Sequence, residues 1–321
     1  MATRVKNIAC LGGGIGTSKL LRGLKAYDFS LSAITSMADD GGSSGRLREA
    51  YNIMPPGDIV SCIAALIPEE DKELEALLLH RFPGKDTHNK AIDGHKLGNL
   101  IMLAEIQRTG NFYKAIDVTK RMFGVTANLL PATDERVDLW AITNDNRRVY
   151  SETTLDLALY SEPRGLKKVY ITPSKPLVNK AVIKTLREAD VIISGPGDLY
   201  TNQLPVLIVP EIKDILLQSK ARKIFILNIA NKPFETKNFA LSDYMTAIKD
   251  HLGEFPFDTI IANNDIKKKF PKDLHYQYVR VDKQASQKIA QTTIIEADVV
   301  YDDFPIYHNP KKLAEVVMKA L

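Results

Sequence analysis

The residues best suited to chemistry lie in one acidic, glycine-rich segment near the N-terminus. It contains two carboxylates, three glycines, two hydroxyls and an arginine: Asp39, Asp40, Gly41, Gly42, Ser43, Ser44, Gly45 and Arg46. Asp39 and Asp40 are candidate Mg²⁺ ligands, because Mg²⁺ prefers carboxylate oxygens. Asp40 is also a candidate catalytic base. The amides and hydroxyls of this loop suit an anion, and the forked guanidinium of Arg46 suits a phosphate. Ordinary turn and helix-capping chemistry is the alternative.

A second candidate site is a glycine turn that follows the first apolar run. Its members are Gly12, Gly13, Gly14, Ile15, Gly16 and Thr17. Glycines let the backbone approach a phosphate, and the next helix presents free N–H groups. The dinucleotide fingerprint is incomplete, because its third glycine would fall on Thr17. A tight strand-to-helix turn without a ligand is the alternative.

A third candidate turn follows another apolar run. The residues expected to bind a ligand there are Gly195, Pro196, Gly197, Asp198 and Tyr200, with Asn228 near the end of the next run. Open parallel sheets bind ligands at the carboxyl ends of their strands. Three such turns at one edge favour a polyanionic ligand, with no tightly bound organic cofactor expected.

Two further polar residues, His95 and Asn99, stand at the start of a predicted helix. His95 is a candidate general base or phosphate contact, and Asn99 a candidate ligand contact; a hydrogen-bonding surface histidine is the alternative. Asp58 follows Pro-Pro-Gly and is expected to cap the helix that begins there.

The elements that position these residues are predicted strands and helices of an α/β fold. Apolar runs at 5–11 and 31–37 flank a helical pattern at 17–25, which is the βαβ signature. Further strands are predicted at 137–142, 168–171, 191–194, 223–229 and 259–262, with helices at 178–189, 211–220 and 241–252. We therefore expect a doubly wound, mainly parallel sheet with helices on both faces.

A helical insertion is predicted at about 57–125, within a single domain that spans 1–321. Its helical patterns lie at 58–67, 72–80, 96–107 and 113–122. A last helix is expected after Asn309 as N-cap and Pro310 at the first position.

Composition narrows the class of protein. The chain has 321 residues, a net charge of +4, 45% hydrophobic and 26% charged residues, which is typical of a globular protein and excludes fibrous repeats. The charge is too small to indicate nucleic-acid binding, and no apolar run approaches the roughly 20 residues of a membrane span. The N-terminal apolar run stops at glycines, unlike a signal peptide. Cys10 and Cys62 lie among apolar residues and indicate reduced thiols. A cytoplasmic location is expected.

The motifs together resemble the bacterial gluconeogenesis factor family over about residues 8–264. The similarity lies in the following blocks, in order: Gly12-Gly13-Gly14 with Lys19-Leu20-Leu21-Arg22-Gly23-Leu24, Asp39 to Arg48, Pro55-Pro56-Gly57-Asp58-Ile59, Gly94-His95 with Gly98-Asn99-Leu100, Leu130-Pro131-Ala132-Thr133-Asp134, Ser194-Gly195-Pro196-Gly197 with Leu199-Tyr200-Thr201, and Asn228. Three positions depart from the family pattern. Asp198 replaces a serine, Lys96-Leu97 follow His95 in place of Ser-Phe, and Tyr307 stands beside His308 where an arginine is common.

The resemblance implies a Rossmann-like three-layer fold, shared with 2-phospho-L-lactate transferase, and a nucleotide site at the strand ends. For the gluconeogenesis-factor branch it implies a cytoplasmic protein that binds a UDP-sugar such as UDP-N-acetylglucosamine. That branch supports cell shape and cell-wall synthesis during gluconeogenic growth. A homodimer and a cell-wall regulatory protein are candidate partners.

Two enzymatic alternatives remain open. The first is an Mg²⁺-dependent transferase of the 2-phospho-L-lactate transferase type, acting on a nucleotide-linked phospho donor with Asp39 or Asp40 on the metal. The second is a nicotinamide-dependent oxidoreductase, which rests on the first glycine turn and Asp39 alone.

Overall fold

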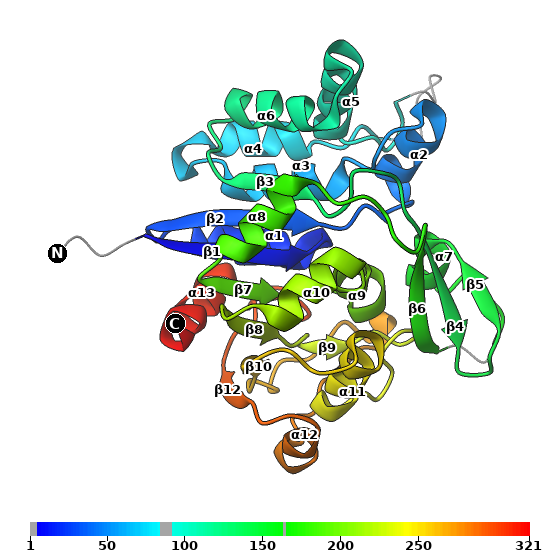
Figure 1. The fold of residues 1–321 in the computed structure, drawn as a ribbon, viewed down its shortest axis with the longest axis vertical. Helices are drawn as coiled ribbons and strands as arrows, with labels where there is room; N and C mark the ends of the chain where they lie inside the picture. Colours follow the sequence, from blue (N-terminus) through cyan, green and yellow to red (C-terminus); the bar gives the residue numbers. More distant parts are fainter. Residues whose placement is uncertain (1–4, 84–91, 163–164) are drawn as a thin grey trace.

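The centre of the molecule is a seven-stranded parallel sheet, seen in a computed structural model that describes residues 5–83, 92–162 and 165–321 (Figure 1). In spatial order its strands are β12 (Thr293–Ala297), β10 (Thr259–Asn263), β8 (Arg222–Ile226), β7 (Val191–Ser194), β1 (Lys6–Gly12), β2 (Phe29–Thr35) and β3 (Asn128–Pro131). The order reverses between β1 and β7, because the chain proceeds outward from β1 in one direction and from β7 in the other. Such a switch point leaves a crevice at the carboxyl ends of the strands.

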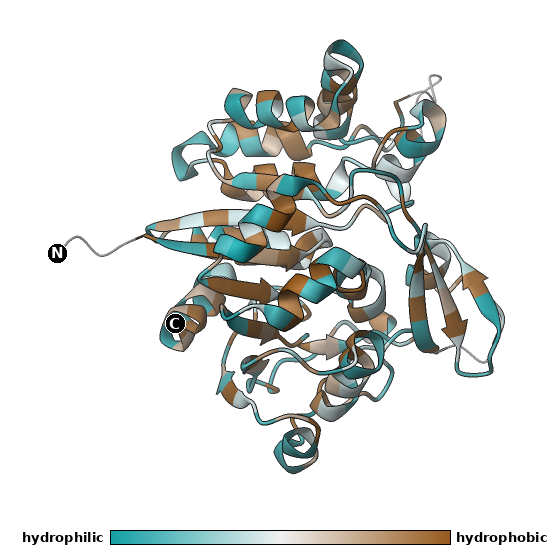
Figure 2. Cartoon of the chain, viewed as in Figure 1, coloured by the Kyte–Doolittle hydropathy of each residue, from teal (hydrophilic) through white to brown (hydrophobic). Residues whose placement is uncertain are grey.

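Helices cover both faces of this sheet. Figure 1 shows α8 (Lys180–Glu188) and α10 (Pro210–Gln218) in front of the strands, with α1 (Gly14–Leu24) and α13 (Pro310–Ala320) behind them. The strands between them are largely buried and apolar, as expected for a parallel sheet covered on both sides (Figure 2). The predicted doubly wound α/β architecture is confirmed. The side chain of Asn309 accepts hydrogen bonds from two amides of α13, as predicted for its N-cap.

A layer of helices lies between β2 and β3 in the sequence, although the two strands are neighbours in the sheet. It consists of α2 (Gly42–Tyr51), α3 (Gly57–Leu66), the 3₁₀ turn η1 (Glu69–Asp71), α4 (Lys72–Leu79), α5 (Leu97–Thr109) and α6 (Phe112–Met122). The segment Gly42-Ser43-Ser44, predicted as part of a loop, is instead the first turn of α2. The helix forms there because Leu47 and Arg48 bury on one of its faces.

A small antiparallel sheet stands beside the main one. Its order is β5 (Arg148–Tyr150), β4 (Asp138–Thr143) and β6 (Leu166–Thr172), and α7 (Glu152–Asp156) follows β5. The runs at 137–142 and 168–171 were expected in the parallel sheet, and this expectation is wrong. Along β4 every second residue is buried, which is the alternation of a sheet with one solvated face.

The remaining elements complete the β7-to-β12 half. They are the π-helical turn η2 (Leu199–Gln203), α9 (Leu204–Leu207), α11 (Leu241–Leu252), the 3₁₀ turn η3 (Lys272–Leu274), α12 (Lys283–Ile289), and the pair β9 (Ala230–Asn231) and β11 (Gln277–Tyr278). No helix in the described part of the chain has the length and apolar character needed to cross a membrane.

Candidate functional site

A cavity of about 450 Å³ opens at the switch point, at the carboxyl ends of the central strands. Its size is within the range of small-molecule sites, roughly 300–1,000 Å³. Segments far apart in the sequence line it: the turns after β1, β2, β7 and β8, the helix α7, and the segment before α13.

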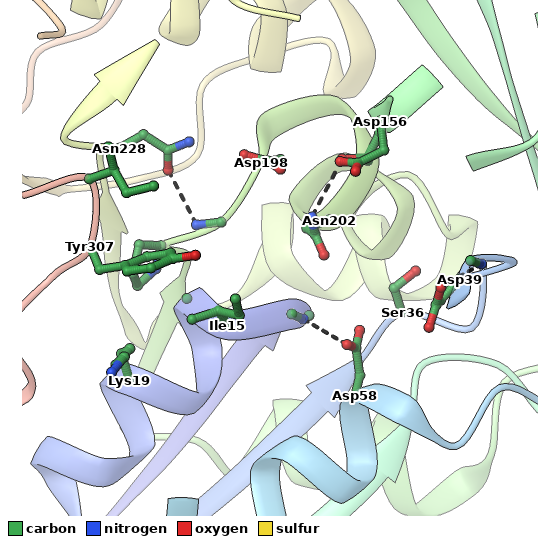
Figure 3. A pocket seen from close by; sticks show the side chains of 18 of the residues that line it. Ile15, Lys19, Ser36, Asp39, Asp58, Asp156, Asp198, Asn202, Asn228 and Tyr307 are labelled. Atoms are coloured by element: carbon green, nitrogen blue, oxygen red, sulfur yellow. Dashed lines mark hydrogen bonds between the residues drawn. The ribbon is translucent and has the colours of Figure 1, made fainter. Parts of the chain in front are cut away.

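The two ends of the cavity differ in chemistry (Figure 3). At one end lie Ile15, Lys19 and Tyr307; at the other lie Asp39 and Asp58. Lys19 is the one Lys or Arg side chain among the described lining residues. Burial, and then the charge of Arg22, lower the pKa of Lys19.

The first glycine turn is shaped by its protein neighbours. Asp58 Oδ1 accepts a hydrogen bond from the Gly14 amide at 2.8 Å (Figure 3). A Cβ on Gly13 would lie 2.2 Å from Asp58 Oδ2, and one on Gly16 would lie 2.0 Å from the carbonyl oxygen of Pro196. Glycine is therefore required here so that a carboxylate and a neighbouring turn can approach.

Asp58 differs from its predicted role. It was expected to cap its own helix, but it occupies the second position of α3 and caps the N-terminus of α1 instead. A carboxylate favours that position, since the first amides of a helix are unpaired and its dipole is positive there.

Three carboxylates of the cavity lack a described lysine or arginine partner at ion-pair distance; we call them the unpaired group: Asp39, Asp58 and Glu152. Burial, and then the charge of Asp39, raise the pKa of Asp58 to about 7. The same two causes, in the same order, raise the pKa of Glu152 to about 9. Burial also raises the pKa of Asp39, although Asp39 Oδ1 accepts a hydrogen bond from the Gly41 amide at 2.9 Å.

A second set of carboxylates surrounds one lysine; we call it the Lys232 group: Asp156, Asp198 and Glu235. Lys232 Nζ forms an ion pair with Asp156 and a second one with Asp198 at 3.2 Å. Burial alone would lower the pKa of Lys232, but Asp198, Glu235 and Asp156 raise it above its ordinary value. Asp198 thus adds a charge to the cavity that Lys232 offsets.

Asp40 does not face the cavity. Its two carboxylate oxygens accept hydrogen bonds from the amides of Glu152 at 3.1 Å and Thr153 at 2.7 Å, at the start of α7. Asp40 therefore ties the loop after β2 to the small sheet. In the described ranges, no group of three or more His, Cys, Asp or Glu residues is arranged to hold a metal ion.

Ser43, His95 and Asn99 form a buried cluster of their own. Ser43 Oγ lies 3.0 Å from His95 Nδ1 and accepts hydrogen bonds from Asn99 Nδ2 at 3.0 Å and from the Lys96 amide at 3.2 Å. Burial, then the charges of Arg46 and Arg81, lower the pKa of His95. This cluster joins α2 to α5 and does not line the cavity.

The structure brings ten of the predicted ligand residues together around the cavity: Gly13, Gly14, Gly16, Asp39, Gly41, Gly42, Pro196, Gly197, Asp198 and Asn228. The Gly197 amide donates to Asn228 Oδ1 at 3.2 Å, which fixes the third turn (Figure 3). The other predicted residues do not line the cavity: Gly12, Thr17, Asp40, Ser43, Ser44, Arg46, His95, Asn99, Gly195 and Tyr200. Thr17 and Tyr200 are buried, Ser44 Oγ accepts from the Gly57 amide at 3.1 Å, and Arg46 is exposed and donates to the Asp93 carbonyl.

Several lining residues escaped the sequence analysis as ligand contacts: Lys19, Asp58, Glu152, Asp156 and Tyr276. The Pro-Pro-Gly-Asp motif marked Asp58 but suggested a cap within its own helix. Glu152 and Asp156 stand on a five-residue helix whose contact with the cavity depends on the small sheet. No local pattern announces that contact.

Comparisons with known proteins agree with the motifs. A family model described as 2-phospho-L-lactate transferase CofD matches residues 8–300. The chain is 37% identical over 321 residues to the gluconeogenesis factor of Bacillus subtilis (strain 168), covering 98% of each chain. It is 36% identical to the gluconeogenesis factor of Halalkalibacterium halodurans, covering 98% of this chain and 96% of the relative.

A solved structure agrees as well. The crystal structure of a UPF0052 family member from Bacillus halodurans matches with a TM-score of 0.89 and 33% identity, over 99% of this chain and 100% of that one. The resemblance predicted from the motifs is confirmed along nearly the whole chain.

Proposed function

The chain belongs to the 2-phospho-L-lactate transferase CofD family, and from this premise we propose that it is a nucleotide-sugar-binding protein of the gluconeogenesis-factor kind. The proposed ligand resembles UDP-N-acetylglucosamine. The proposed role is support of cell shape and cell-wall synthesis during gluconeogenic growth, in the cytoplasm and through a regulatory protein partner. The names of the relatives support the link to gluconeogenesis.

The observation that carries the ligand proposal is the division of one cavity into two chemically different ends. Lys19 and the first-turn amides of α1, apart from the Gly14 amide that donates to Asp58, suit a diphosphate. Beside them, Ile15 and Tyr307 offer flat and apolar surface to a base. The carboxylates elsewhere in the cavity are hydrogen-bond acceptors, which suits the hydroxyl groups of a sugar.

Thermal unfolding with and without UDP-N-acetylglucosamine tests this function. At one hundred times its dissociation constant, a ligand of the folded state should add about 2.7 kcal/mol of stability. UDP, UDP-glucose, GDP and NAD serve as comparison ligands. No stabilisation by any UDP compound at millimolar concentration would contradict the proposal.

Lys19→Met provides the matched test of the site. The variant should lose most of the stabilisation by UDP-N-acetylglucosamine, because it removes the cavity's lysine. Lys184→Met, on the exposed side of α8, should keep it. Equal responses from both variants would remove Lys19 from the site.

An Mg²⁺-dependent transferase is the second candidate, favoured by the unpaired group. Asp39 and Asp58 line the cavity, whereas the oxygens of Asp40 are engaged by amides. Asp39 and Asp58 would hold the metal, which would supply stabilisation of the charge that develops on a transferring phosphoryl group. Sites of this kind typically use one or two carboxylates together with substrate phosphates.

Release of nucleoside monophosphate from a nucleotide-linked donor, measured with and without Mg²⁺, tests this candidate. Asp39→Asn and Asp58→Asn should each abolish an Mg²⁺-dependent release, while Asp40→Asn should retain part of it. If nucleoside monophosphate were released at the same rate without Mg²⁺ and by these variants, the assignment of Asp39 and Asp58 as metal ligands would be contradicted.

A further inference from the structure

The outer face of the small sheet gathers aromatic and basic side chains. Strand register places Tyr150, Trp140 and Tyr170 in one row across β5, β4 and β6, and Arg148, Ile142 and Lys168 in the next row. The alternating residues Leu139, Ala141 and Val169 point to the opposite, buried face. The six residues of the two rows therefore form one surface, the aromatic–basic face, at the side of the molecule (Figure 1).

The aromatic row is pre-organised. The rings of Trp140 and Tyr170 stack with centroids 4.3 Å apart, and those of Trp140 and Tyr150 with centroids 6.1 Å apart. Arg148 lies over the Trp140 ring at 5.4 Å and Lys168 over the Tyr170 ring at 5.9 Å. Tyr150 is nevertheless 60% exposed. Rings and cations already held in place lose little conformational entropy when a partner docks.

The charge of the face is uncompensated. Neither Arg148 nor Lys168 forms an ion pair with a carboxylate of the described residues; Lys168 Nζ donates only to the backbone carbonyl of Asp250, at 3.2 Å. The neighbouring carboxylate of Asp138 is paired with the buried Arg48. The face thus presents two positive charges beside an aromatic row.

We propose that the aromatic–basic face is a docking surface for a protein segment that carries carboxylate side chains next to apolar ones. Tryptophan, tyrosine and arginine are the residues that most often dominate binding energy at protein interfaces. The unpaired cations select the charge of the partner and hold its register. Tyr170 stacks on the Trp140 ring and Arg148 lies over it, which leaves less of this ring for stacking of nucleic-acid bases.

Trp140 is the chain's single tryptophan, so its fluorescence reports on this face in the full-length protein. The probe is a short synthetic peptide of alternating glutamate and leucine, with a lysine–leucine peptide as its control. We expect the acidic peptide to bind and change the Trp140 emission, and the basic peptide to do neither. No binding of the acidic peptide up to millimolar concentration would overturn the proposal.

Charge-reversed variants locate the binding. Arg148→Glu and Lys168→Glu should each lower the affinity for the acidic peptide by about tenfold. Lys184→Glu and Arg187→Glu, on α8, should leave its affinity within about twofold. Equal losses in both pairs would mean general electrostatic attraction and would overturn the assignment to this face.

Two further outcomes distinguish other occupants. Tighter binding of a single-stranded oligodeoxynucleotide than of the peptide would overturn the choice of a protein partner. Sedimentation that shows a dimer of the wild type and a monomer of Tyr150→Asp would mean that a second copy of the chain covers this face. Either result would replace the proposal.

Discussion

The unpaired group and the Lys232 group lie in and around the same cavity, but among the described residues only the Lys232 group has a lysine that forms ion pairs with its carboxylates. Lys232 supplies a buried positive charge to Asp156 and Asp198. Asp39 and Asp58 each accept a backbone hydrogen bond, and none of the three carboxylates of the unpaired group pairs with a lysine or arginine in the described part of the chain. Burial raises the pKa of Asp39, Asp58 and Glu152. The comparison shows that Lys232 offsets two of the three carboxylates in its group, whereas burial and then the charge of Asp198 raise the pKa of the third, Glu235, to about 8.

The largest expected effect comes from removing Lys232, the cation of the Lys232 group. Lys232→Met would leave Asp156, Asp198 and Glu235 without their cation, and unpaired buried charge is strongly destabilising. Because Asp156 and Asp198 are partly exposed, we expect a loss of about 2–3 kcal/mol. Denaturant unfolding at pH 7 measures it.

Lys283→Met is the control for this loss. It removes a lysine from an exposed pair with Glu296, so the change should stay within about 0.5 kcal/mol. Similar losses in the two variants would show that burial of Lys232 adds nothing.

The next effect is a pH dependence of the unpaired group. The folded pKa of Asp58, about 7, exceeds its ordinary 3.8, so the folded chain holds the proton more tightly than the unfolded chain does. The contribution of Asp58 to stability is therefore present at low pH and falls as pH rises from about 4 to 7, after which it is constant.

Asp58→Asn should flatten this dependence. The amide oxygen can still accept the hydrogen bond from Gly14, so the variant should match the wild type near pH 4 and exceed it at pH 8, on the order of 2 kcal/mol. Melting temperatures across this pH range measure it, with Glu188→Gln on exposed α8 as the control. If the stability difference between Asp58→Asn and the wild type were the same at pH 4 and at pH 8, the raised pKa of Asp58 would be contradicted.

A smaller effect is expected where the loop after β2 meets α7. Asp40→Ala removes the acceptor of two α7 amides and should cost about 1 kcal/mol, as for other helix caps. Asp40→Asn should cost less, because its side-chain oxygen still accepts. Chemical denaturation compares the two, and equal losses would mean that the charge matters more than the cap.

The smallest stability effect sharpens the comparison on the side of Lys232. Asp198→Ser leaves Asp156 as a partner of Lys232, so stability should change by about 0.5 kcal/mol or less. Removal of one negative charge should raise the affinity for UDP by severalfold. Calorimetric titration checks this, and unchanged affinity would place the diphosphate away from Asp198.

The parallel half of the fold is the part that sequence predicts well. Strands β1, β7 and β10 and helix α11 are nearly continuous apolar or amphipathic patterns, and the structure forms them at or within a residue or two of the predicted ranges. The strands of the small sheet were also found, but their place was not. Which sheet a strand joins depends on contacts distant in sequence, and the alternation along β4 was the available signal.

Within the cavity, sequence located turns better than side chains. Gly13, Gly16 and Gly197 line it because strand ends converge, which follows from the topology. The direction of Asp40 and Asp58 does not follow. Asp40 accepts from two amides more than 110 residues further along the chain, and Asp58 accepts from the single amide of Gly14, 44 residues earlier. Which of the adjacent carboxylates, Asp39 or Asp40, faces the cavity is decided by contacts that form only in the folded chain.

The buried guanidinium of Arg48 has a consequence beyond charge balance. Through Asp138 it joins α2, which begins at the cavity, to β4, whose outer face carries Trp140. Asp40, in the loop before α2, makes a second tie, to the start of α7 beside the small sheet. If the proposed ligand and the proposed docking partner both bind, thermodynamic reciprocity would relate them: whatever factor a ligand in the cavity applied to docking on β4, docking would apply to ligand binding.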